Sequence, residues 1–261
     1  MEKKETSKRL GMGFNVGEEE IWIYGDSIDE LIIALEELKD GSIIIRFIEK
    51  VKNLSKEQLK RIDRLILTFK EIEVIYEYFM KRIKIDNEIA NFLKYEDAII
   101  ASKNAEYIYQ FAINVKGGDI SKLQDAIIAS ENAEYIYEFA RDVKGADISK
   151  LQDSIIASQK VLYIHRFAMN VTNADISELQ DAIIASKNAE YIYYFAMNVN
   201  GADISKLQDA IIETKDVNYI YSFAKKSKKD FREVKKAVKK TKDAELIREY
   251  RKIIKELKCF F

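Results

Sequence analysis

The sequence predicts an all-α protein, an αα-solenoid in which about eight helix pairs form a right-handed superhelix. The chain has 261 residues with no proline and only nine glycines, which favours long helical stretches over a turn-rich β fold. A word close to Tyr-Ile-Tyr recurs every 28 residues, a period typical of stacked repeats. It begins at Tyr107, Tyr135, Tyr163, Tyr191 and Tyr219. Each period contains two helical hydrophobic patterns.

The first helical pattern of a repeat begins with a capping signal that has two interpretations. In residues 148–158, Ile148, Leu151 and Ile155 fall on one helix face. Ser149 and Gln152 have the spacing of a capping box, whereas Asp147 is an equally suitable N-cap. The Ser-x-x-Gln spacing recurs at Ser121/Gln124, Ser177/Gln180 and Ser205/Gln208. Both interpretations start the helix at the same place.

The aspartates at these helix starts, Asp119, Asp147, Asp175 and Asp203, also suggest a row of metal ligands. Equivalent residues of stacked helices lie about 10 Å apart. Oxygen ligands must approach one ion to about 2.6 Å. We therefore expect these aspartates to cap helices, and we expect no metal site.

The second helical pattern, residues 132–143, begins at the potential N-cap Asn132 and ends near Gly145, which suits the left-handed C′ position. A helical winding gathers one broad apolar arc: Ala133, Ile136, Tyr137, Phe139, Ala140 and Val143. The opposite side holds Glu134, Glu138, Arg141 and Asp142, with Tyr135 at the border. Neither helix exceeds four turns, so stacking must stabilise both.

The repeat pattern weakens towards both ends, and this divides the chain into four segments. Residues 1–26 form an N-terminal tail with a possible β-hairpin cap, whose glycine-bounded runs flank Gly17 and Glu18. Residues 27–86 hold degenerate helical repeats, residues 87–227 the regular 28-residue repeats, and residues 228–261 a basic capping repeat. The glycines of residues 11–17 lack the spacing of a phosphate-binding loop, and hairpin turns account for them.

The recurring phrase AEYIYxFAxxVKGADIxKLQDAII resembles short helical repeats in proteins of AT-rich bacteria and their phages. The resemblance covers residues 93–227. It implies a solenoid similar in architecture to HEAT, TPR and armadillo arrays, although the Trp-x-x-Leu-Gly pattern of TPR is missing. It implies no particular activity.

The sequence favours a cytoplasmic protein without a membrane partner. No apolar run reaches the ~18 residues of a membrane span, and the start lacks the apolar core of a secretory signal. The single cysteine, Cys259, cannot form an internal disulfide, which fits a reducing compartment.

We expect no enzyme activity, no catalytic residue and no cofactor. The only histidine, His165, occupies the register of Tyr109, Tyr137, Tyr193 and Tyr221, so we expect a ring at the edge of the core. A ligand or catalytic role for His165 is the less favoured alternative. Cys259 stands almost at the end of the sequence, so no Cys-His pair is built with it.

Our leading hypothesis is a scaffold or inhibitor that binds a protein partner through its concave face. Second helices usually line that face in αα-solenoids. Its exposed positions vary between repeats and include Met, Tyr and Arg, which are enriched at interfaces, although drift is the alternative explanation. The predicted binding residues are Tyr107, Gln110, Tyr135, Glu138, Arg141, Tyr163, Arg166, Met169, Tyr191, Tyr194, Met197 and Tyr219.

The alternative hypothesis is nucleic-acid or ribonucleoprotein binding by the basic end, which includes a phage-encoded blocker of a bacterial defence complex. The last 38 residues contain 15 Lys or Arg and six Asp or Glu, whereas the remainder contains 28 and 38. A basic cluster of this kind binds phosphate backbone without sequence preference, although a solvated helix face explains it equally. The cluster comprises Lys225, Lys226, Lys228, Lys229, Arg232, Lys235, Lys236, Lys239 and Lys240.

Overall fold

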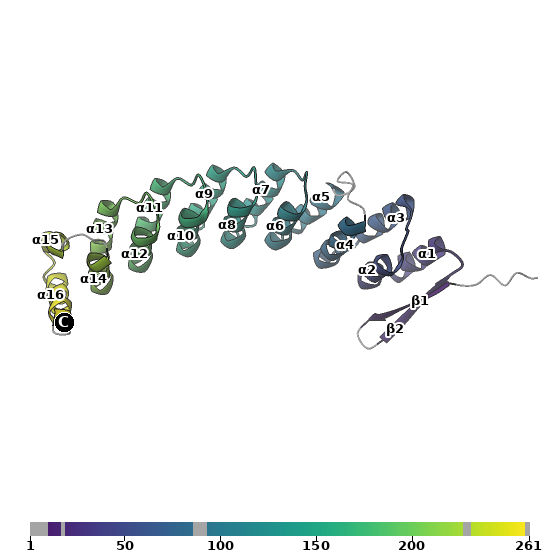
Figure 1. The fold of residues 1–261 in the computed structure, drawn as a ribbon, viewed down its shortest axis with the longest axis horizontal. Coiled ribbons are helices and arrows are strands. Elements are labelled where there is room, and N and C mark those ends of the chain that lie inside the picture. Colours follow the sequence, from purple (N-terminus) through teal and green to yellow (C-terminus); the bar gives the residue numbers. More distant parts are fainter. Residues whose placement is uncertain (1–9, 17–18, 86–92, 227–230, 259–261) are drawn as a thin grey trace, which may run out of the picture. The chain divides into compact units, whose positions relative to one another are not determined.

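A computed structural model describes residues 10–16, 19–85, 93–226 and 231–258 of the chain. These residues form 16 α-helices and one two-stranded antiparallel sheet (Figure 1). The chain divides into two compact units, Met1–Asp119 and Ile120–Phe261. The helices pack consecutively along each unit, which confirms the predicted all-α solenoid with a short N-terminal β-hairpin.

Unit 1 begins with the hairpin, followed by three helix pairs. The strands are β1 (Leu10–Val16) and β2 (Glu19–Gly25), and the predicted turn at residues 17–18 lies outside the described residues. The helices are α1 (Ile28–Leu38), α2 (Gly41–Lys50), α3 (Lys56–Ile66), α4 (Ile72–Ile85), α5 (Leu93–Ser102) and α6 (Ala105–Asn114). The hairpin packs on α1 and α2, where Phe14 and Ile23 enter the core.

Unit 2 contains the most regular repeats and the basic end. Its helices are α7 (Ile120–Ala129), α8 (Ala133–Asp142), α9 (Ile148–Ala157), α10 (Val161–Asn170), α11 (Ile176–Ala185), α12 (Ala189–Asn198), α13 (Ile204–Glu213), α14 (Val217–Lys226), α15 (Phe231–Lys240) and α16 (Ala244–Lys258). The first helices α7, α9, α11 and α13 form one layer. The second helices α8, α10, α12 and α14 form another, on the inner side of the curve that this unit describes (Figure 1).

The core of unit 2 lies between these two layers and follows the predicted apolar arc. All six predicted residues of α8 and its C-cap are buried: Ala133, Ile136, Tyr137, Phe139, Ala140 and Val143. Asn132 caps α8 as expected, but Lys160, the N-cap residue of α10, makes no side-chain cap hydrogen bond. Gly145 is left-handed, with φ of +85°, although it lies two residues beyond the C-cap Val143 rather than at C′.

An aspartate caps each of the helices α9, α11 and α13, which decides between the two sequence interpretations. The carboxylate of Asp147 accepts from the backbone N–H of Lys150. Asp175 and Asp203 cap α11 and α13 in the same way. The capping-box interpretation is wrong for these repeats because the glutamine side chain bonds to the next repeat and not to the start of its own helix.

That glutamine is buried and connects one repeat to the next. Gln152 is 3% exposed, and its Oε1 accepts from the backbone N–H of Asp175 at 2.7 Å. We call this hydrogen bond the inter-repeat clip. It recurs at 2.7 Å between Gln124 and Asp147 and between Gln180 and Asp203. In unit 1, Glu96 Oε2 accepts from the backbone N–H of Asp119 at 2.9 Å. The clip therefore supplies an acceptor for a part-buried backbone amide and fixes the offset between successive first helices.

Replacing the clip acceptor by an apolar side chain should destabilise the protein. In Gln180→Leu the backbone N–H of Asp203 loses its acceptor, and because this hydrogen bond is only part-buried we expect the net cost of one hydrogen bond, about 0.5–1.5 kcal/mol. Urea unfolding followed by circular dichroism should show a loss of that size. Gln180→Glu keeps an acceptor, as Glu96 does in unit 1, and should lose less. Equal stability of Gln180→Leu and the wild type would contradict the role of the clip.

Candidate functional site

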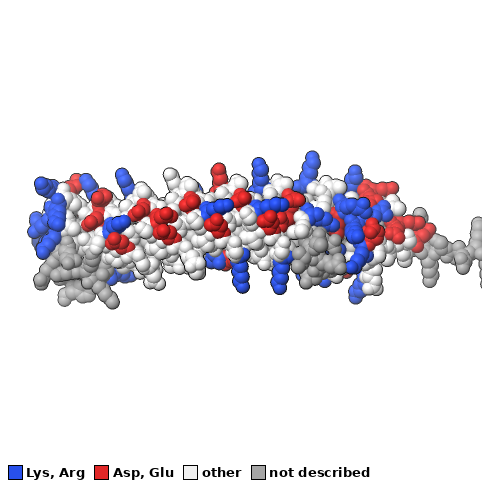
Figure 2. All heavy atoms as spheres, turned by 90° about the horizontal axis from the view of Figure 1, so that it is seen from above, with Lys and Arg blue, Asp and Glu red and all other residues white. Residues whose placement is uncertain are grey.

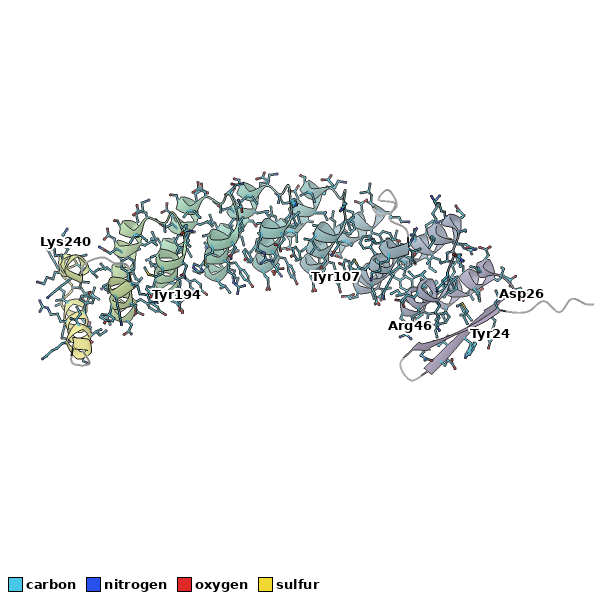
Figure 3. All side chains as sticks on the ribbon, viewed as in Figure 1. Tyr24, Asp26, Arg46, Tyr107, Tyr194 and Lys240 are labelled. Atoms are coloured by element: carbon cyan, nitrogen blue, oxygen red, sulfur yellow. The ribbon has the colours of Figure 1, made fainter. Side chains whose placement is uncertain are left out.

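The predicted binding residues of unit 2 share one surface, which we call the second-helix face. Each of these side chains is exposed or half-buried, so none belongs to the buried core. Figure 3 shows Tyr194 on the side of α12 that points away from the first-helix layer. The face comprises Tyr135, Glu138, Arg141, Tyr163, Arg166, Met169, Tyr191, Tyr194, Met197 and Tyr219. The two other predicted residues, Tyr107 and Gln110, are half-buried on α6 of unit 1.

The aromatic contacts along this face join unlike registers of neighbouring repeats. Tyr163 contacts Tyr137 of the preceding repeat, with ring centroids 6.3 Å apart. Tyr219 contacts Tyr193 in the same way at 5.9 Å. Equivalent residues on helices 8–10 Å apart are too distant for ring contact, whereas a diagonal pair is close enough.

Two arginines on the face lie over tyrosine rings of their own helices. The guanidinium carbon of Arg166 is 5.6 Å from the centroid of Tyr163, and that of Arg141 is 5.1 Å from Tyr137. Arg141 also forms an ion pair with Asp142 at 2.6 Å. Cation–π stacking restricts such a side chain without burying its charge. Arg166 therefore presents an ordered, exposed cation on α10.

The centre of the face is an aromatic cluster on α10 and α12. Tyr194 is 38% exposed, and its ring centroid lies 6.4 Å from His165 and 5.6 Å from Tyr193. Met169 on α10 is 46% exposed. Tyr194 thus packs more closely against the scaffold than its exposed register suggests. Removing the Tyr194 side chain should therefore also lower the stability of the fold.

His165 occupies the expected position at the edge of the core and is only 8% exposed. In the preceding repeat, the hydroxyl of Tyr137 accepts from Asn170 Nδ2 at 3.0 Å. The shorter imidazole has no such contact, and among the described residues its Nε2 has no hydrogen-bond partner. Burial lowers the pKa of His165; a backbone hydrogen bond with Tyr194 opposes this shift, and the charge of Arg166 adds a smaller lowering. The ring is therefore held neutral.

The lowered pKa of His165 should make stability depend on pH. Because the folded-state pKa lies below the ordinary value of 6.5, the unfolded chain binds the proton more tightly. The stability that the neutral His165 ring contributes to the fold is complete above pH 6.5, and it is lost as the pH falls through the folded-state pKa. We expect the urea midpoint of the wild type to fall, relative to that of His165→Tyr, between pH 7 and about 5.

His165→Tyr is a matched control because tyrosine is the residue of this register in the flanking repeats. Both proteins share every carboxylate, and His165 is the only histidine, so the difference isolates the imidazole. Parallel pH profiles would contradict the buried, neutral state of His165.

The basic end places four exposed lysines on one helix. In α15, Val234 and Val238 are buried, while Lys235, Lys236, Lys239 and Lys240 point outward. None of these four forms a salt bridge within the described part of the chain. Lys225 and Lys226 are exposed at the end of α14, and Figure 2 shows basic side chains gathered at this end of unit 2. Lys228, Lys229 and the side chain of Arg232 lie outside the described residues.

A buried polar cluster in unit 1 was missed by the sequence analysis. Asp63 is fully buried, and its Oδ1 accepts from the hydroxyls of Tyr78 and Tyr95, each at 2.8 Å. Arg82 Nε donates to the same oxygen at 3.2 Å, and Lys94 Nζ to Oδ2 at 2.8 Å. Burial raises the pKa of both tyrosines. With four donors the carboxylate joins α3, α4 and α5, and we interpret the cluster as structural.

Comparison with known proteins adds no assignment to this geometry. No protein-family model, curated protein or solved structure matches the chain. In the described ranges, no three His, Cys, Asp or Glu side chains lie close enough together to hold a metal ion. No helix in those ranges is both long and apolar enough to cross a membrane.

Proposed function

We propose that the protein is a non-enzymatic helical-repeat scaffold or inhibitor that binds a protein partner through the second-helix face. The observation that carries this proposal is the group Arg166, Met169 and Tyr194 at the centre of unit 2. These residues are exposed, lie on adjacent helices and belong to types enriched in interface cores. The repeat fold does not depend on these residue types, because other repeats carry Glu138 at the position of Arg166, Arg141 at that of Met169 and Ser222 at that of Tyr194.

The packing of this group supports a binding role because it lowers the entropic cost of association. Arg166 is ordered over Tyr163, and Tyr194 is fixed by contacts with three rings, those of His165, Tyr191 and Tyr193. Side chains that are ordered before binding lose little freedom on binding. The flexible Met169 beside them adapts to the shape of a partner.

The charged residues on the two sides of this centre differ, so the two ends of the second-helix face are not equivalent. Glu138 and Arg141 on α8 provide both signs of charge, whereas Lys225 and Lys226 on α14 provide positive charge alone. A complementary partner would place an apolar or aromatic patch at Tyr194 and acidic groups towards α14. Such an arrangement favours one binding orientation over the reverse.

Truncation at the centre of the face should weaken partner binding. We expect Arg166→Ala and Tyr194→Ala each to cost about 1–3 kcal/mol of binding free energy, the range of interface hot spots. The partner would be captured from the source organism on the wild-type protein, identified, and its affinity for each variant measured by calorimetry. Circular dichroism melts would separate the loss of binding from any loss of stability in Tyr194→Ala.

Lys150→Ala and Asp153→Ala provide the control because both residues are exposed on α9, in the first-helix layer. These variants should bind as the wild type does. Normal binding by Arg166→Ala and Tyr194→Ala, together with loss on neutralising Lys235, Lys236, Lys239 and Lys240, would refute the proposal.

That second outcome would favour nucleic-acid or ribonucleoprotein binding, which the four exposed lysines of α15 support as an alternative. Contacts to phosphate would make the affinity fall steeply with salt, and nuclease treatment would remove the captured material. A partner that survives nuclease and binds with weak salt dependence supports the protein-binding proposal instead.

A further inference from the structure

The outer face of the β1–β2 hairpin carries two exposed aromatic rings. Trp22 and Tyr24 are 49% and 54% exposed. Their ring centroids lie 6.1 Å apart, and their planes are inclined by only 17°. On the opposite face Phe14 and Ile23 are buried against the helices. The hairpin therefore uses one face for the core of unit 1 and presents a flat aromatic pair on the other.

Two glycines on β1 allow these rings to lie flat. Gly11 is opposite Tyr24 and Gly13 opposite Trp22 in the strand register. A Cβ on Gly13 would stand 2.8 Å from a carbon of the Trp22 ring, and one on Gly11 would stand 3.0 Å from the Tyr24 ring. Glycine weakens a strand and often marks a close approach. Here the Trp22 and Tyr24 rings approach the two glycines closely, and the ring surfaces that face away from the strand stay exposed.

Carboxylates flank the aromatic pair. A Cβ on Gly13 would also lie 2.8 Å from Glu20 Oε1, so this carboxylate sits beside the Trp22 ring above the same glycine. Asp26 is exposed just beyond Tyr24 (Figure 3). Lys50 reaches the hairpin from the side of Phe14, where its Nζ donates to the carbonyl of Gly13. The outer face is thus rich in π surface and negatively charged.

We propose that this face, formed by Glu20, Trp22 and Tyr24 over Gly11 and Gly13, binds an arginine side chain of a partner polypeptide. A guanidinium is planar and weakly hydrated, so it stacks on aromatic rings while donating to a carboxylate. The ring quadrupoles and Glu20 attract it together. The same charges oppose a phosphate backbone, which argues against nucleobases as the stacked group. This site in unit 1 is independent of the second-helix face.

The chain provides its own reporter for this site because Trp22 is the only tryptophan. The full-length protein would be titrated with a synthetic peptide in which arginine alternates with serine, and its tryptophan emission recorded. Matched peptides would carry lysine or glutamate in place of arginine, and a single-stranded oligothymidine would represent nucleic acid. We expect a saturable change with the arginine peptide, weaker binding of the lysine peptide, and no change with the other two.

Variants assign the signal to the platform. Tyr24→Ala removes half of the stacking surface, and Glu20→Gln removes the charge but leaves the rings and the strand intact. Each should weaken arginine-peptide binding by about tenfold or more, while Glu245→Gln, an exposed change on α16, should have no effect.

The proposal is overturned by no saturable change up to about 1 mM arginine peptide, the affinity of a very weak contact. It is also overturned by equal binding of the glutamate peptide, by tighter binding of oligothymidine, or by wild-type affinity in Glu20→Gln.

Discussion

Each of three consecutive repeat junctions in unit 2 contains the same part-buried hydrogen bond, from the backbone N–H of an aspartate to a buried glutamine side chain 23 residues earlier. The donor belongs to the residue that caps the next first helix, so the bond fixes both where that helix starts and how it sits on its predecessor. Loss of the glutamine acceptor would remove the stabilisation of one hydrogen bond from the junction. Among the described residues Gln208 Oε1 has no partner, and it is the last glutamine of the series.

Regular junctions give the second helices a constant offset, and this offset arranges the second-helix face. Tyr163 meets Tyr137, Tyr191 meets His165 and Tyr219 meets Tyr193, always with the same diagonal step. Positions that do not take part in stacking are free to differ between repeats. Variation of chemistry on a constant frame is the property that lets solenoids serve as binding surfaces.

The sequence predicted the helices well because their apolar arcs and the 28-residue period can be recognised from short stretches of sequence. The arc of α8 and the N-terminal hairpin are confirmed. The sequence failed where a polar side chain is buried by tertiary packing, as at Gln152 and Asp63, because hydrophobic periodicity treats both as surface residues. Asp63 does share the buried side of α3 with Leu59, Ile62 and Ile66, and that placement was the available signal. The partner-binding role of Arg166 and Tyr194 remains a prediction.

Amide hydrogen exchange at Asp147, Asp175 and Asp203, followed by NMR, tests the clip most directly. These amides precede their helices and would exchange quickly if they faced solvent. We predict protection as strong as that of amides inside the first helices, and loss of protection at Asp203 alone in Gln180→Leu. Asn132, whose amide bonds only to the Ser130 side chain, provides a weakly protected reference. Exchange of the three aspartate amides at the rate of Asn132 would contradict the account.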